Sequence, residues 1–183
     1  MSDTMSPKAS STTTSNATAD PGEEPIVWNA KLLHIYISPG HDYWTPKGEG
    51  RLMHGIQSPR EVRAVEDMGL EGDRYFGEKP GGKAQVTFIQ ADVLDEVRQK
   101  FKLPKLPAGV LRRNLVVEGV QLADFMGKTF EFQGVLFEGS QQCSPCQWMD
   151  RVIAEGAQAF LKGDFRGGLR AKVKSTGVLR VDD

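Results

Sequence analysis

The sequence has little cysteine, no long hydrophobic run and almost no net charge. Only two cysteines occur in 183 residues, which excludes a framework of structural disulfides. No apolar run approaches the roughly 18 residues of a membrane-spanning helix, and the N-terminus lacks the apolar core of a secretory signal. A formal net charge of −1 gives no overall attraction to nucleic acid or anionic lipid. The cysteine spacing fits a reducing compartment, so we expect a cytoplasmic protein with no membrane partner.

Residues 1–25 also have almost no large apolar side chains and are rich in Ser and Thr. Such a composition cannot bury enough surface to fold, so we expect a disordered tail over residues 1–25. A transit peptide is the alternative interpretation, but this stretch holds several acidic residues and no arginine. Residues 26–183 are long enough to form a single domain with a hydrophobic core.

The folded part is punctuated by turns, since the chain has 20 glycines and 10 prolines. Leu33, Ile35 and Ile37 alternate along one expected strand. Two apolar runs flank Gln133-Gly134, which predicts a hairpin, and we expect a second hairpin around residues 175–177. Helical periodicity is confined to residues 92–102 and 145–161. Many short strands with few helices favour a mainly β protein, specifically a β barrel rather than an α/β sheet.

Both cysteines lie in one segment, Gln142-Cys143-Ser144-Pro145-Cys146-Gln147. Pro145 suits the first position of a helix and Ser144 suits its cap. On this interpretation Cys146 lies in the first helical turn, where free backbone N–H groups favour a thiolate. A thiolate there can attack a substrate, carry sulfur or bind a soft metal.

The C-terminal region holds the strongest local charge. Residues 162–180 carry six positive side chains and one acid, Asp164. Gly167-Gly168, between Arg166 and Arg170, would let the backbone approach an anion closely. Arg166 and Arg170 are therefore candidate phosphate ligands, although basic residues in a hairpin are also typical of a solvated face.

A second group of polar candidates lies earlier in the chain. Arg112 and Arg113 form a basic pair before Asn114, and Arg74 follows Asp73. Arginines favour phosphate binding because their donors match its oxygens. The structural alternatives are an ion pair between Asp73 and Arg74, and pairing of one of the two neighbouring arginines with a carboxylate.

Four segments in this order resemble the MOSC domain, the family named for the C-terminal domain of molybdenum-cofactor sulfurases. They are Gly69-Leu70-Glu71-Gly72-Asp73-Arg74-Tyr75, Arg112-Arg113-Asn114-Leu115-Val116-Val117-Glu118-Gly119-Val120, Pro145-Cys146 and Gly167-Gly168-Leu169-Arg170-Ala171. The resemblance covers residues 30–182 and identifies the chain as a small stand-alone member. It implies the family's β barrel with a few peripheral helices.

The resemblance also implies a molybdenum cofactor, with Cys146 ligating the metal or taking up sulfur. A thiolate suits such a metal because soft ligands select thiophilic centres. The function would be reduction of N-hydroxylated substrates or sulfur transfer, with an electron-donating or cofactor-delivering protein as a partner. The larger relatives carry a pyridoxal-phosphate domain or an added barrel domain, and we expect neither here, nor pyridoxal phosphate. The expected cofactor-binding residues are Arg74, Arg112, Arg113, Asn114, Arg166 and Arg170.

Three other interpretations remain open from the residues. The C-x-x-C spacing permits a dithiol redox module using Cys143 and Cys146. The same cysteines with two histidines would make a zinc site. A small barrel with a basic hairpin also fits nucleic-acid binding, although the near-zero net charge disfavours it. Trp148, beside the cysteines, suits either stacking on a pterin or ordinary packing.

Overall fold

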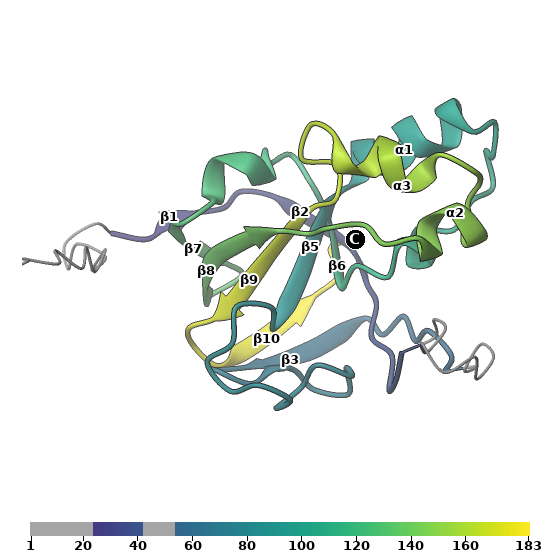
Figure 1. Cartoon of the computed structure of the whole chain (residues 1–183). Helices are drawn as coiled ribbons and strands as arrows, with labels where there is room; N and C mark the ends of the chain where they lie inside the picture. The colour runs from purple at the N-terminus through teal and green to yellow at the C-terminus, as the bar shows by residue number, and fades with distance from the viewer. Residues whose placement is uncertain (1–23, 42–53) are drawn as a thin grey trace, which may run out of the picture.

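The computed structural model describes residues 24–41 and 54–183 (Figure 1). The tail expected over residues 1–25 therefore lies outside the described residues, apart from Glu24 and Pro25. The described part is mainly β, as predicted, and none of its helices is long and apolar enough to cross a membrane. The strands are β1 (Ile26–Val27), β2 (Lys31–Ile35), β3 (Glu61–Val65), β4 (Gly69–Leu70), β5 (Val86–Gln90), β6 (Leu115–Glu118), β7 (Thr129–Phe132), β8 (Val135–Gln142), β9 (Leu169–Val173) and β10 (Gly177–Arg180). The helices are α1 (Ala91–Lys100), α2 (Trp148–Val152) and α3 (Ala157–Lys162), and short 3-10 turns span Ala108–Leu111 and Leu122–Phe125.

The strands form two sheets that face each other. Seven strands follow the order β1-β7-β8-β9-β5-β6-β2, and three follow the order β10-β3-β4. The pairs β1–β7 and β5–β6 are parallel, whereas the other neighbours are antiparallel. The larger sheet curls over the smaller one as a half-barrel (Figure 1).

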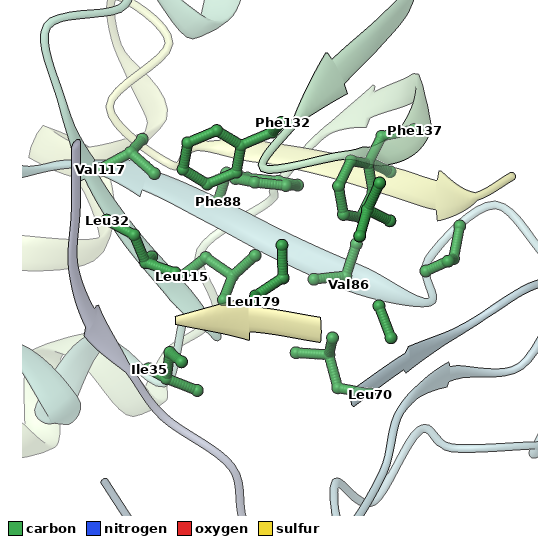
Figure 2. Packing of buried hydrophobic residues seen from close by; sticks show 14 of the residues in the cluster. Leu32, Ile35, Leu70, Val86, Phe88, Leu115, Val117, Phe132, Phe137 and Leu179 are labelled. Atoms are coloured by element: carbon green, nitrogen blue, oxygen red, sulfur yellow. The ribbon is translucent and has the colours of Figure 1, made fainter. Parts of the chain in front are cut away.

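The main core fills the space between the two sheets. Phe88, Leu115 and Phe137 of the larger sheet pack with Leu70 and Leu179 of the smaller one (Figure 2). Alternation places these side chains inside: along β9, for example, every second residue is buried. Each large apolar side chain buried in this way contributes about 1.5–3 kcal/mol.

A second core lies on the outer face of the larger sheet, under the helices. Ile89 of β5 and Val116 of β6 pack there against Val97 of α1, Met149 of α2 and Leu161 of α3. The three helices gather on one side of the molecule (Figure 1). The cysteine segment, which connects β8 to α2, therefore lies at the border between the sheet and the helical layer.

The structure confirms one predicted hairpin and corrects the other, and it also corrects the buried face predicted for β2. The hairpin at Gln133-Gly134 is confirmed, since β7 pairs with β8. The second hairpin is wrong: β9 pairs with β8 and β5, whereas β10 joins β3 in the other sheet. In β2 the register shifts between Leu32 and His34. Leu32 is therefore buried with Ile35, and Leu33 is only partly buried, because one extra residue moves a side chain to the opposite face.

Candidate functional site

A pocket of about 580 Å³ opens where the cysteine segment meets α3, β9 and two loops of the sheet. Among its described lining residues are five arginines and one cysteine, but no aspartate or glutamate. Positive side chains that line a concave surface concentrate a positive electrostatic potential there, and this potential attracts anions. The lining comprises Arg74, Tyr75, Leu111, Arg112, Arg113, Ser144, Pro145, Cys146, Gln147, Trp148, Met149, Arg151, Gln158 and Arg170.

The cysteine segment does not start a long helix, which corrects one prediction. Helix α2 begins only at Trp148, Gln147 is its cap residue, and no side chain caps its N-terminus. Cys146 therefore precedes the helix, and its carbonyl oxygen accepts a turn hydrogen bond from the Met149 N–H at 3.0 Å. The predicted stretch 145–161 instead contains two short helices, because the chain turns at Gly156 with φ of +85°.

The two cysteines have opposite environments. Cys146 is exposed and lines the pocket, whereas Cys143 is only 2% exposed, and both are free thiols. Burial raises the pKa of Cys143, although the nearby charges of Arg113 and Arg170 and a hydrogen bond from Arg170 partly oppose that shift. Cys146 is thus the sulfur that a ligand in the pocket can reach, whereas Cys143 is not among the lining residues.

Two of the pocket arginines are held by neutral groups. The Arg113 Nε donates to the Gly167 carbonyl oxygen at 2.7 Å and its Nη1 to the Leu111 carbonyl oxygen at 3.0 Å. The Arg170 Nη1 donates to Oε1 of Gln141 at 3.2 Å. Neutral acceptors orient a guanidinium without cancelling its charge, so both side chains remain available to attract an anion.

Arg74 and Arg112 line the pocket from two loops, one after β4 and the other before β6. The Arg74 Nη1 lies 3.3 Å from Oδ2 of buried Asp73, so the predicted ion pair is present together with a position on the pocket wall. The guanidinium also stacks on the Tyr75 ring, and its Nε is buried without a hydrogen-bond partner. The Arg112 Nη2 donates to the Gly40 carbonyl oxygen at 2.8 Å. A buried donor without a partner marks a place where an acceptor would be stabilised.

Two expected cofactor-binding residues lie elsewhere. Asn114 is buried directly before β6: its Oδ1 accepts from the Thr87 N–H, and its Nδ2 donates to the Tyr36 carbonyl oxygen. Arg166 lies outside the pocket and pairs with Glu96 at 2.6 Å and Asp164 at 2.7 Å. Neither residue lines the pocket, and both use polar groups of their side chains in bonds to other parts of the protein.

The basic C-terminal region does not form one binding surface. Three of its positive side chains are in ion pairs: Arg166 with Glu96, Lys172 with Glu138, and Arg180 with Glu61. Only Arg170 of this group lines the pocket.

The glycine pair of the same region serves packing rather than anion binding. A Cβ on Gly168, which has φ of +88°, would collide with the Phe88 carbonyl oxygen, and one on Gly167 would meet that of Cys143. The two glycines therefore allow the backbone segments beneath the pocket to touch.

Sequence reasoning missed several lining residues, among them Arg151, Gln158 and Tyr75. Tyr75 belongs to the motif that contains Arg74, so the motif could have indicated it. Arg151 and Gln158 had no signal of their own, because their position depends on the turn at Gly156 between α2 and α3. Trp148, weighed earlier as a stacking residue, is buried and also lines the pocket.

The zinc interpretation finds no support in residues 24–41 and 54–183. No group of three His, Cys, Asp or Glu side chains there could hold a metal ion. His34 and His41 instead contact the rings of Tyr36 and Tyr75. A smaller hollow of about 300 Å³ beside α1 contains Asp92, and none of its described lining residues is a cysteine or a histidine.

Comparisons with known proteins agree with this architecture. A family model for the MOSC domain matches residues 70–183. The fold is similar to the crystal structure of the YuaD protein from Bacillus subtilis, with a TM-score of 0.62, 16% identity, and coverage of 83% of this chain and 91% of that one. It is also similar to YiiM from Geobacillus stearothermophilus, with a TM-score of 0.61, 15% identity, and coverage of 82% and 71%.

A third similar structure is YiiM from Escherichia coli, with a TM-score of 0.56 and 21% identity over 69% of this chain. The match covers 61% of that protein, and 60% of another crystal structure described as a hypothetical protein. No curated protein matches the chain. At these identities the structural similarities establish the fold.

Proposed function

The chain belongs to the MOSC domain family, and on that premise we propose that its arginine-lined pocket binds a molybdenum cofactor with the Cys146 thiolate as metal ligand. One observation carries the proposal: an exposed cysteine shares a pocket with five arginines, and the described lining contains no acid. A thiolate and a guanidinium cluster are the two donor types that a thiophilic metal and a phosphate require.

The residues present suit each part of such a cofactor. Arg113 and Arg170, oriented by neutral acceptors, would bind the phosphate. The buried Arg74 Nε would donate to an acceptor on the cofactor. Tyr75 and Trp148 offer aromatic surface beside them for a planar ring. Cys146 would then contribute its sulfur to the metal.

When bound, the cofactor supplies two-electron redox chemistry at its metal. The chain's own residues would bind it, orient it and hold a positive environment around the reacting atoms. We propose reduction of an N-hydroxylated compound as the reaction class. Two electrons and two protons convert the hydroxylamine to an amine and water, and the electrons come from a separate donor protein.

The test is to express the protein in a host that makes the cofactor and to measure molybdenum and pterin per chain. We expect Cys146→Ala to remain folded and to lose molybdenum. Cys143→Ser is the matched control, since it removes the other thiol and should retain the metal. Equal molybdenum content in the wild type and Cys146→Ala would refute metal ligation by Cys146.

The same samples separate the competing roles of this thiol. A persulfide on Cys146, detected by mass spectrometry in protein without molybdenum, would indicate sulfur transfer instead. Loss of function in both single-cysteine variants, with a reversible disulfide, would indicate the dithiol redox module.

A further inference from the structure

The backbone next to Cys146 is held by one side chain from another helix. The Nε2 of Gln158, on α3, donates to the Pro145 carbonyl oxygen at 3.2 Å. That carbonyl belongs to the peptide group whose nitrogen is the Cys146 nitrogen, so the bond restrains the plane from which the cysteine side chain projects. Within the described structure, no other side chain hydrogen-bonds the backbone of residues 144–146.

Gln158 is itself fixed by the helical layer. Its backbone N–H donates to Oδ1 of Asp150, on α2, at 2.7 Å. Its neighbours Ala157 and Leu161 are buried in the second core. The path from Asp150 through Gln158 to Pro145 therefore connects α2, α3 and the cysteine segment, and the amide reaches Pro145 from a rigid support.

We propose that Gln158 is a positioning residue that keeps the Cys146 sulfur directed at the arginine cluster. Such support is needed because Cys146 lies in a turn before the helix and no regular hydrogen-bond ladder holds it. Gln158 also lines the pocket, so its side chain connects α3 to the same cavity that Cys146 lines. The inference rests on the proposed role of Cys146, but its test reads the thiol directly.

The test compares alkylation of Cys146 by anionic iodoacetate and by neutral iodoacetamide in the full-length protein. Buried Cys143 is shielded in the folded state, and mass spectrometry confirms the labelled site. A positive pocket should raise the iodoacetate-to-iodoacetamide rate ratio by about tenfold over a cysteine in a short unstructured peptide. In Gln158→Met, which keeps size and charge but removes the donor, we expect this ratio to fall by about threefold or more.

Gln147→Met is the matched control. Gln147 adjoins Cys146 and lines the same pocket, but its side chain makes no hydrogen bond with the described residues, so the ratio should stay near the wild-type value. Gln158→Asn, whose amide is one methylene too short to reach Pro145, should behave as Gln158→Met does. Its milder change provides the test if Gln158→Met does not fold.

Three results would overturn the proposal. They are an unchanged ratio in a folded Gln158 variant, an equal fall in Gln147→Met, and a wild-type ratio no higher than that of the peptide. Molybdenum retained by Cys146→Ala would instead refute the proposed function and leave the positioning role standing. The two failures are therefore distinguishable.

Discussion

The Arg113 Nε donates to the carbonyl oxygen of Gly167 across 2.7 Å, although the two residues are 54 positions apart in the chain. This bond ties the loop before β6 to the start of β9, and it aligns a guanidinium along the pocket wall. Arg113 therefore has a structural role and a place in the candidate site, and the two can be measured separately.

We expect Arg113→Ala to lower the free energy of unfolding by about 1.5–3 kcal/mol, the usual contribution of hydrogen bonds from a charged donor. Urea denaturation would measure the change. Arg63→Ala is the control: its ion pair with Glu71 is exposed, and exposed pairs contribute about 0–1 kcal/mol. Equal losses in the two variants would show that the bonds of Arg113 contribute no more than a surface pair.

A second pair of variants tests which arginine binds the cofactor. Arg170→Ala should weaken cofactor retention about tenfold, since one charge-assisted contact is lost. Arg166→Ala should leave retention unchanged, because Arg166 pairs with Glu96 and Asp164 outside the pocket. Pterin fluorescence after dialysis provides the measurement. A larger loss in Arg166→Ala would contradict the location of the site.

Asn114 should matter for folding rather than for binding. Removing its amide takes away the side-chain partner of the Thr87 N–H and of the Tyr36 carbonyl oxygen. Asn114→Ala should therefore lower the free energy of unfolding by about 2–4 kcal/mol. Asn29→Ala, at an exposed asparagine, should stay within about 0.5 kcal/mol of wild type in the same denaturation experiment. A stable Asn114→Ala would show that this network is dispensable.

The burial of the Cys143 thiol should make the free energy of unfolding depend on pH. Burial raises its pKa above the ordinary thiol value of 9.0, so the folded protein holds this proton more tightly than the unfolded chain. The resulting stabilisation is complete below that value and is lost as pH rises through the raised folded pKa.

The free energy of unfolding of the wild type should therefore fall faster as pH rises above about 9 than that of Cys143→Ser, since serine does not titrate there. Denaturation curves at several pH values measure both slopes. Parallel slopes would mean that the Cys143 thiol is not buried as described.

Local patterns indicated several strands but not all of their partners. The Gln133-Gly134 turn depends on neighbouring residues, and it was predicted correctly. The partner of β10 was not, because β10 pairs with β3, more than a hundred residues earlier. The residue pattern of a strand indicates which of its faces is buried, but not which other strand it pairs with.

The candidate site shows the same division. Motif resemblance identified Cys146, Arg74, Arg112, Arg113 and Arg170, and all five line the pocket. It also selected Asn114 and Arg166, whose polar groups are used by Thr87 and Glu96. Such partners lie far away in the chain, so their occupation of a donor or acceptor cannot be read from the motif itself.

The sequence alone determined the class of fold and the pair of candidate thiols, because alternation, turn residues and a solitary pair of cysteines are local properties. The tertiary structure decided which cysteine is accessible, which arginines converge on it, and that Gln158 supports its backbone. Those outcomes depend on burial and on contacts between distant segments. They arise only when the helical layer packs on the sheet and brings separate charges into one concave surface.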